Sequence, residues 1–127
     1  MPRYNKNNIK ELKEYLYNSC VHDAELKNIK CDYIEDQIEI ELFNPIFDVK
    51  ILLTFLNIGI TFSVKGDWSG NRETINSLTV EDDFSYLHNY LIKHSENRED
   101  SLYMLFQMFS GDELHIVSKE VIIETVG

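Results

Sequence analysis

Residues 20–31 hold the densest group of side chains whose types can do chemistry. His22 is followed directly by Asp23, and a carboxylate beside an imidazole can orient it as a general base or support a metal-bound histidine. Adjacent residues of an extended strand, however, point to opposite faces. We therefore interpret the pair as a helix-to-strand junction, in which Asp23 satisfies backbone N–H groups and His22 packs or hydrogen-bonds.

A metal site is a second chemical option for the same segment. Cys20, His22 and Cys31 are close in sequence, but their spacing matches no zinc knuckle or ribbon. His88 and His94 fall on different sides of a helix. Motifs for phosphate loops, dinucleotide binding, zinc proteolysis and serine hydrolysis are absent. The sequence therefore predicts no catalytic residues, no metal and no cofactor.

Carboxylates cluster in three places, at residues 35–36, 81–83 and 96–100. Paired acids can cleave glycosides or hold magnesium. All three clusters lie at predicted turns or element ends, where acids are usually solvated or cap a helix. We therefore favour a structural reading of the clusters over a catalytic one.

Docking of another protein is the chemistry that the sequence favours instead. Glu39 and Glu41 project together from one predicted strand, and an acidic face suits a basic partner. Trp68 lies in a glycine-bounded loop, either as an exposed anchor or folded over the core. The candidate partner-binding residues are Trp68, Asp67, Asp32, Glu35, Asp36, Glu39 and Glu41.

The overall charge narrows the class of partner. The chain has 127 residues with 12 basic and 22 acidic side chains, a net charge of −10. Binding to the backbone of DNA or RNA needs clustered Lys and Arg, and anionic lipid attracts polybasic segments. We therefore expect neither nucleic acid nor membrane as the partner.

Length and hydrophobicity predict one domain over residues 1–127. Of the residues, 43% are hydrophobic, which is ample for a packed core. The first 14 residues lack the apolar region of a secretory signal, and no apolar run reaches the length of a membrane span. We expect a cytoplasmic protein in which both cysteines are reduced and buried.

The hydrophobic spacing predicts elements that would position these residues. An amphipathic stripe predicts a helix over about 8–19, and two-residue alternation then predicts an antiparallel hairpin over 25–44. Residues 47–65 form either a hairpin or one long bent strand, and their apolar residues on both faces predict a central strand covered on both sides. A strand at 75–80 and a second helix near 83–94 follow.

The last third of the chain predicts a hairpin and a final strand. Residues 102–109 are apolar on both faces, so they could leave a patch or an open edge for self-pairing. The expected fold is α+β: one curved, mainly antiparallel sheet of about six to seven strands, with the N-terminal helix packed on its concave face.

Several short motifs share their order with a known group of proteins. They are His22-Asp23-Ala24-x-Leu26-x-x-Ile29, the acidic hairpin, the long apolar strand, the Gly-Asp-Trp loop and Phe109-Ser110-Gly111-Asp112-Glu113-Leu114-x-Ile116. This order resembles a broad group of small uncharacterised bacterial cytosolic proteins, some of which resemble immunity proteins of polymorphic toxin systems. The resemblance implies a non-catalytic domain whose acidic surface neutralises a toxin, often a basic nuclease.

The sequence thus favours a non-catalytic acidic binding protein, an immunity protein that occludes a basic toxin. Two alternatives stay open. One is a small-ligand binder or enzyme with a pocket between helix and sheet, to which His22 and His115 would contribute. The other is a structural homo-oligomer such as a homodimer.

Overall fold

The fold is known from a computed structural model, which describes residues 3–32, 34–57, 62–65, 74–81, 101–108 and 112–126. For residues 62–65 and 76 the description covers the backbone. The elements in chain order are β1 (Arg3–Asn5), η1 (Lys6–Asn8), α1 (Ile9–Asn18), β2 (Glu25–Asp32), β3 (Gln37–Asn44), β4 (Val49–Leu56), β5 (Phe62–Lys65), β6 (Ile75–Glu81), β7 (Leu102–Met108), β8 (Glu113–Ser118) and β9 (Glu120–Val126).

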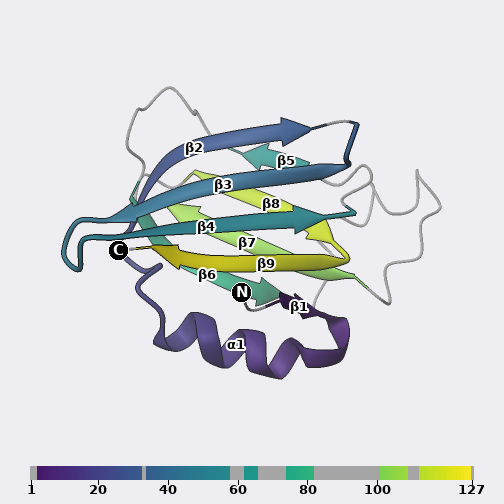
Figure 1. Cartoon of the computed structure of the whole chain (residues 1–127), viewed down its shortest axis with the longest axis horizontal. Helices are drawn as coiled ribbons and strands as arrows, with labels where there is room; N and C mark the ends of the chain where they lie inside the picture. The colour runs from purple at the N-terminus through teal and green to yellow at the C-terminus, as the bar shows by residue number, and fades with distance from the viewer. Residues whose placement is uncertain are drawn as a thin grey trace.

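The described strands form two antiparallel sheets that pack face to face. The first has the order β1-β9-β4-β3-β2 and the second the order β5-β8-β7-β6. Strands of the second sheet run obliquely behind those of the first (Figure 1). The α+β class, the antiparallel pairing and the N-terminal helix are therefore confirmed. The expectation of a single sheet with six to seven strands is wrong.

The second sheet arises because the chain changes sheets at two points. β8 ends at Ser118 in the second sheet, and β9 begins at Glu120 in the first. Between them the Lys119 N–H donates to the Leu56 carbonyl, 3.1 Å away, which holds the corner against β4. Such corners are the usual way in which one bent strand serves two sheets. The alternation of apolar and polar residues shows which face of a strand each side chain occupies, but it does not show which strands lie beside it.

Residues 47–65 make the other change of sheet, so β4 and β5 do not pair as a hairpin. Whether they form one long bent strand turns on residues 58–61, which lie outside the described residues. β4 pairs with β3 and β9, whereas β5 pairs with β8. Asn57 follows β4 with a φ of 57°, a left-handed conformation that asparagine tolerates better than most residues. The central position of β4 is confirmed. Its predicted cover on both faces is wrong, because Leu52 and Leu56 on the outer face are only half-buried.

The core fills the space between the sheets. Its largest side chains include Phe55 of β4 and Phe106 of β7, whose rings meet edge-on with their centroids 6.1 Å apart. The predicted hairpin over 25–44 is confirmed as β2 and β3, with Ile40 buried and its neighbours half-buried. Asn44 ends β3 from a buried position, and its amide group donates to the Cys20 carbonyl at 2.7 Å.

The helix closes one side of this sandwich and does not lie on a concave face. α1 contacts β1 and β6, which are the last strands of the first and second sheets on that side (Figure 1). Its apolar stripe inserts Leu12 fully into the core, between the two edges. The predicted range 8–19 agrees with the observed Ile9–Asn18. In the described part of the chain, no helix has both the length and the apolar character needed to cross a bilayer.

Two expectations about single elements have different outcomes. Both cysteines are free thiols as expected, but Cys31 is exposed and Cys20 only half-buried. Cys31 lies on β2, the last strand of the first sheet, where a side chain has a neighbouring strand on one side only. The second helix near 83–94 lies outside the described residues.

Candidate functional site

The turn between β2 and β3 brings three of the predicted partner-binding residues together. The Asp32 carboxylate accepts hydrogen bonds from the backbone N–H of Ile34 (3.0 Å) and of Glu35 (3.1 Å). Asp36 has a φ of 53°, and its carbonyl accepts the Asn57 N–H at 3.0 Å. These bonds fix the turn, because short aspartate side chains replace the missing ladder bonds.

This turn also exposes an apolar side chain that the sequence analysis passed over. Ile34 is 93% exposed, more than any other large hydrophobic residue of the described chain. Asp32, Glu35 and Asp36 surround it in sequence. We call these four residues the acidic tip. An exposed isoleucine among carboxylates combines an apolar surface with a negative field at the acidic tip.

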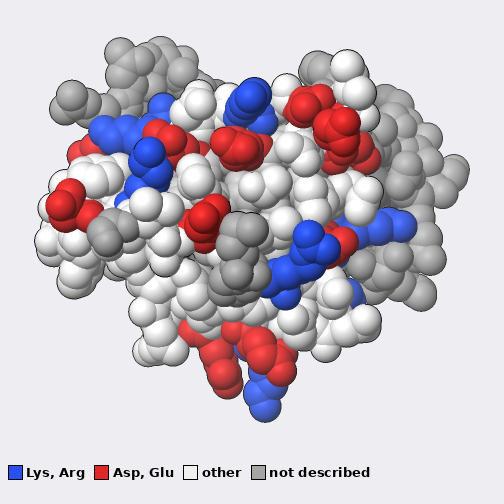
Figure 2. Space-filling model, in the orientation of Figure 1, with Lys and Arg blue, Asp and Glu red and all other residues white. Residues whose placement is uncertain are grey.

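Glu39 and Glu41 lie on β3 beyond the acidic tip, on the outer face of the first sheet. Lys30 is the register partner of Glu39, and the Lys50 ammonium lies 3.8 Å from the Glu41 carboxylate. Basic and acidic side chains are interspersed over this face (Figure 2). The face is therefore mixed in charge, and the acidic tip is the described region where three predicted acids meet in one turn. Trp68 and Asp67 lie outside the described residues.

His22 and Asp23 form a looser pair than a catalytic dyad needs. The imidazole Nε2 lies 3.8 Å from the Asp23 carboxylate, with the two side chains 61% and 44% exposed. These residues lie at the predicted junction between α1 and β2, in a turn where Asp23 has a φ of 70°, so the opposite-face geometry of an extended strand does not apply to them. An exposed pair at this distance contributes little to stability.

His115 lies in a different place, on the outer face of the second sheet. Its ring is 1% exposed, with Nε2 3.2 Å from the Glu113 carboxylate and Nδ1 2.7 Å from the Tyr103 hydroxyl. An ionised carboxylate only accepts, so we assign the ring proton to Nε2, and the Tyr103 hydroxyl then donates to Nδ1. Among the described residues, His115 and His22 do not line a common pocket.

This network stabilises the second sheet. Tyr103 is 2% exposed and packs in a cluster with Leu105 and Val117, separate from the main core. Buried polar groups of this kind must be paired, because an unpaired one costs free energy. The arrangement of tyrosine, histidine and glutamate can move a proton in principle, but at this burial the ring and the phenol do not reach solvent.

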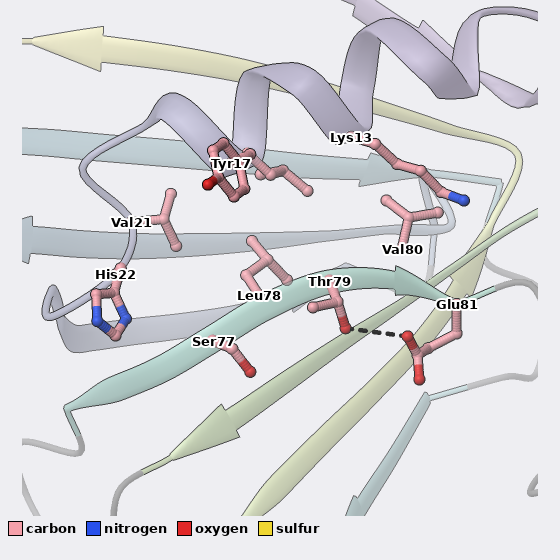
Figure 3. A pocket seen from close by; sticks show the side chains of 10 residues that line it. Lys13, Tyr17, Val21, His22, Ser77, Leu78, Thr79, Val80 and Glu81 are labelled. Atoms are coloured by element: carbon pink, nitrogen blue, oxygen red, sulfur yellow. Dashed lines mark hydrogen bonds between the residues drawn. The ribbon is translucent and has the colours of Figure 1, made fainter.

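A groove lies between α1 and β6, where the sequence analysis expected a pocket against the sheet. Its volume is about 470 Å³. Figure 3 shows Leu78 and Val80 pointing toward the helix, with Ser77 turned the other way. The lining residues are Lys13, Leu16, Tyr17, Val21, His22, Ser77, Leu78, Thr79, Val80 and Glu81. Of the two histidines predicted for a pocket, His22 lines this groove.

The β6 side of the groove escaped the sequence analysis. Residues 77–81 alternate small polar and aliphatic side chains, a pattern typical of any half-buried strand. What makes them a candidate site is that β6 ends the second sheet, and strand order is a property of distant pairing. The sequence carried no local signal for it.

No metal centre forms among these residues. Within the described ranges, no three His, Cys, Asp or Glu side chains converge on a point where they could hold an ion. Comparison with protein-family models and with curated proteins finds no match for this chain. The function must therefore be argued from the acidic tip and the groove themselves.

Proposed function

We propose that this protein is a non-catalytic acidic binding protein, an immunity protein that neutralises a basic toxin such as a nuclease by occlusion. The observation that carries the proposal is the acidic tip, in which Ile34 is 93% exposed beside Asp32, Glu35 and Asp36. The net charge of −10 adds a long-range attraction for a basic partner.

Occlusion follows from the chemistry of the two surfaces. A nuclease needs Lys and Arg to hold phosphate, and carboxylates that pair with those groups compete directly with its substrate. Ile34 would be withdrawn from water at the centre of the contact, and Glu39 and Glu41 would extend it along β3. The hydrogen bonds from Ile34 and Glu35 to Asp32 hold the turn in advance, which lowers the entropy lost on binding.

The test uses the toxin encoded by the neighbouring reading frame, with its nuclease domain as the probe. We expect the protein to bind that domain, to suppress its cleavage of nucleic acid and to restore growth of cells that express it. Because steering weakens with ionic strength, association should slow steeply between low and physiological salt. Binding that is indifferent to salt, or the lack of any neighbouring toxin, would contradict the proposal.

A matched pair of variants places the contact on the acidic tip. Ile34→Ala should weaken binding by about 2 kcal/mol, roughly thirtyfold, the effect of removing a central anchor. Ile46→Ala removes the same side chain from the turn between β3 and β4, where Ile46 is 70% exposed, and should leave the affinity unchanged. Equal losses in both variants would mean that the partner docks elsewhere.

A further inference from the structure

We propose that the groove between α1 and β6 binds an extended segment of a partner polypeptide, which adds as a further strand of the second sheet to the outer edge of β6, where no described strand pairs with Ser77 to Glu81. This site is distinct from the acidic tip and does not depend on the function proposed for it. Four features of the described residues support the inference: the lining of the groove, the pairing at its closed end, its dimensions and the alternation of its side chains.

The lining shows that the groove follows the edge of β6 and not one of its faces. Five consecutive residues, Ser77 to Glu81, all contribute to it. Successive side chains of a strand point to opposite faces, so a pocket on one face would contact every second residue. A groove along the edge, which borders the backbone of every residue, accounts for all five. It therefore runs beside the backbone N–H and C=O groups that face away from β7, which edge strands leave available for pairing.

The beginning of β6 already pairs on this edge with another part of the chain. The Ile75 N–H donates to the Ala24 carbonyl at 2.8 Å, and the Asp23 N–H donates to the Ile75 carbonyl at 2.9 Å. Glu25 and Thr74 form an antiparallel bridge beside them. Since β7 lies on the other side of Ile75, these bonds use the outer edge. The outer edge of β6 therefore pairs with an extended backbone at Ile75. Val21 and His22, which precede the paired residues in the chain, turn away from the strand, and the groove begins there (Figure 3).

The dimensions suit a short extended peptide. A strand rises about 3.3 Å per residue, so the edge from Ser77 to Glu81 spans about 13 Å and pairs with four or five residues. α1 forms the opposite wall, to which Lys13, Leu16 and Tyr17 contribute. Helix and edge strand together can hold a peptide by its backbone while the helix contacts its side chains, a recognised mode of peptide binding.

The alternation along β6 defines the partner's chemistry. Leu78 and Val80 are buried and turned toward the helix, so the residues that pair with them should be aliphatic. The hydroxyls of Ser77 and Thr79 donate to Gln107 Oε1 (3.0 Å) and Glu81 Oε2 (3.2 Å), and these small polar side chains favour Ser or Thr opposite them. Glu81 favours a Lys or Arg, in keeping with the net charge of −10. The expected ligand is a peptide that alternates Ser or Thr with Val or Ile and carries a basic residue at the Glu81 end.

The experiment titrates two synthetic peptides into the full chain and follows the backbone amides by NMR. The probes are Lys-Val-Thr-Ile-Thr for antiparallel addition and Thr-Ile-Thr-Val-Lys for parallel addition, both with blocked ends. We expect one of them to shift the amides of residues 77–81 and 13–17. The matched control replaces by proline a residue whose N–H faces the edge of β6, which is the isoleucine opposite Leu78 in the antiparallel peptide and the central threonine in the parallel one. Proline has no N–H, so this control should bind at least tenfold more weakly.

A charge exchange tests the orientation of the bound peptide. Glu81→Gln should weaken the lysine peptide by about tenfold, and Glu81→Lys should restore binding to a peptide in which glutamate replaces lysine. Glu124→Gln, a similar change on the outer face of the first sheet, should have no effect. Ile34→Ala should also leave peptide binding intact, which separates this site from the acidic tip.

Three results would overturn the proposal. The first is the absence of shifts along β6 with either peptide at millimolar concentration. The second is equal binding of the proline peptide, which would mean that side chains alone are recognised, as in a small-ligand pocket. The third is a concentration-dependent shift of residues 77–81 without peptide, which would identify a second copy of the chain as the occupant of the β6 edge.

Discussion

The outer faces of the two sheets differ in what they expose. Along β3 in the first sheet, buried and half-buried residues alternate strictly, so one face is wet. Along β7 in the second sheet, every residue except Gln107 is buried, so both faces are enclosed. Polar side chains on the outer face of the first sheet therefore meet solvent, whereas the enclosed outer face of the second sheet holds the buried network of Tyr103, His115 and Glu113.

This difference distinguishes exposed sites, where the proposed binding would occur, from an enclosed face that stabilises the fold. The acidic tip and the groove lie at ends and edges, where removing one side chain leaves little unfilled space. The enclosed face of the second sheet has tight packing and paired polar groups, where loss of an atom leaves a cavity or an unpaired donor. Variants should thus fall into two classes, those that weaken binding and those that weaken folding.

The largest expected effect comes from the same substitution at two outer-face positions. Leu105→Ala on β7 removes a side chain that is 7% exposed and should lower the free energy of unfolding by about 2–5 kcal/mol. Leu52→Ala on β4 removes a half-buried leucine whose site solvent can fill, and should cost at most about 1 kcal/mol. Urea denaturation followed by circular dichroism measures both. Equal losses would mean that the two outer faces are alike.

A smaller effect is expected from removing one oxygen atom. Tyr103→Phe keeps the ring but leaves Nδ1 of His115 without its 2.7 Å partner, which should cost about 1–3 kcal/mol of unfolding free energy. Tyr17→Phe makes the same change at a side chain that is 90% exposed, and should stay within about 0.5 kcal/mol of the wild type. If the two variants unfold at the same urea concentration, the buried network does not stabilise the second sheet.

The wet face of the first sheet was predictable because its cause is local. Ile38, Ile40 and Leu42 alternate with glutamates, and one polar turn joins β2 to β3, so the sequence specifies both the hairpin and its register. The helix was predictable for the same reason, since its stripe recurs every three or four residues.

The enclosed face and the groove result from the pairing of strands that are distant in sequence, which the alternation of apolar and polar residues does not reveal. Residues 102–109 are apolar on both faces, which the sequence analysis interpreted as a patch or an open edge. β7 instead lies inside the second sheet, between β6 and β8. β6, which like β5 is an end strand of the second sheet, carries ordinary alternation, and its position at the end depends on which strands pair across dozens of residues. The same non-local pairing placed His22 and His115 at separate sites.

The smallest expected effect concerns Tyr15, whose burial is intermediate between those of the two outer faces. It appears only at alkaline pH. Tyr15 of α1 is half-buried beside Tyr4 of β1, with ring centroids 6.0 Å apart. Burial, and to a lesser extent the neighbouring Tyr4 and Cys20, raise the pKa of the Tyr15 phenol above its ordinary value of 10.0.

The sign of the pH dependence follows from that shift in the Tyr15 pKa. The unfolded chain releases the phenolic proton of Tyr15 at the ordinary pKa, which is a lower pH than the folded chain requires. The contribution of the protonated Tyr15 phenol to the free energy of unfolding is therefore fully present below about pH 10. It is lost as the pH rises through the pKa of Tyr15 in the folded chain. Urea denaturation between about pH 8 and pH 11 should show stability falling at the alkaline end, less steeply in Tyr15→Phe than in the wild type. An unchanged slope in Tyr15→Phe would show that α1 is as open to solvent at Tyr15 as the outer face of the first sheet.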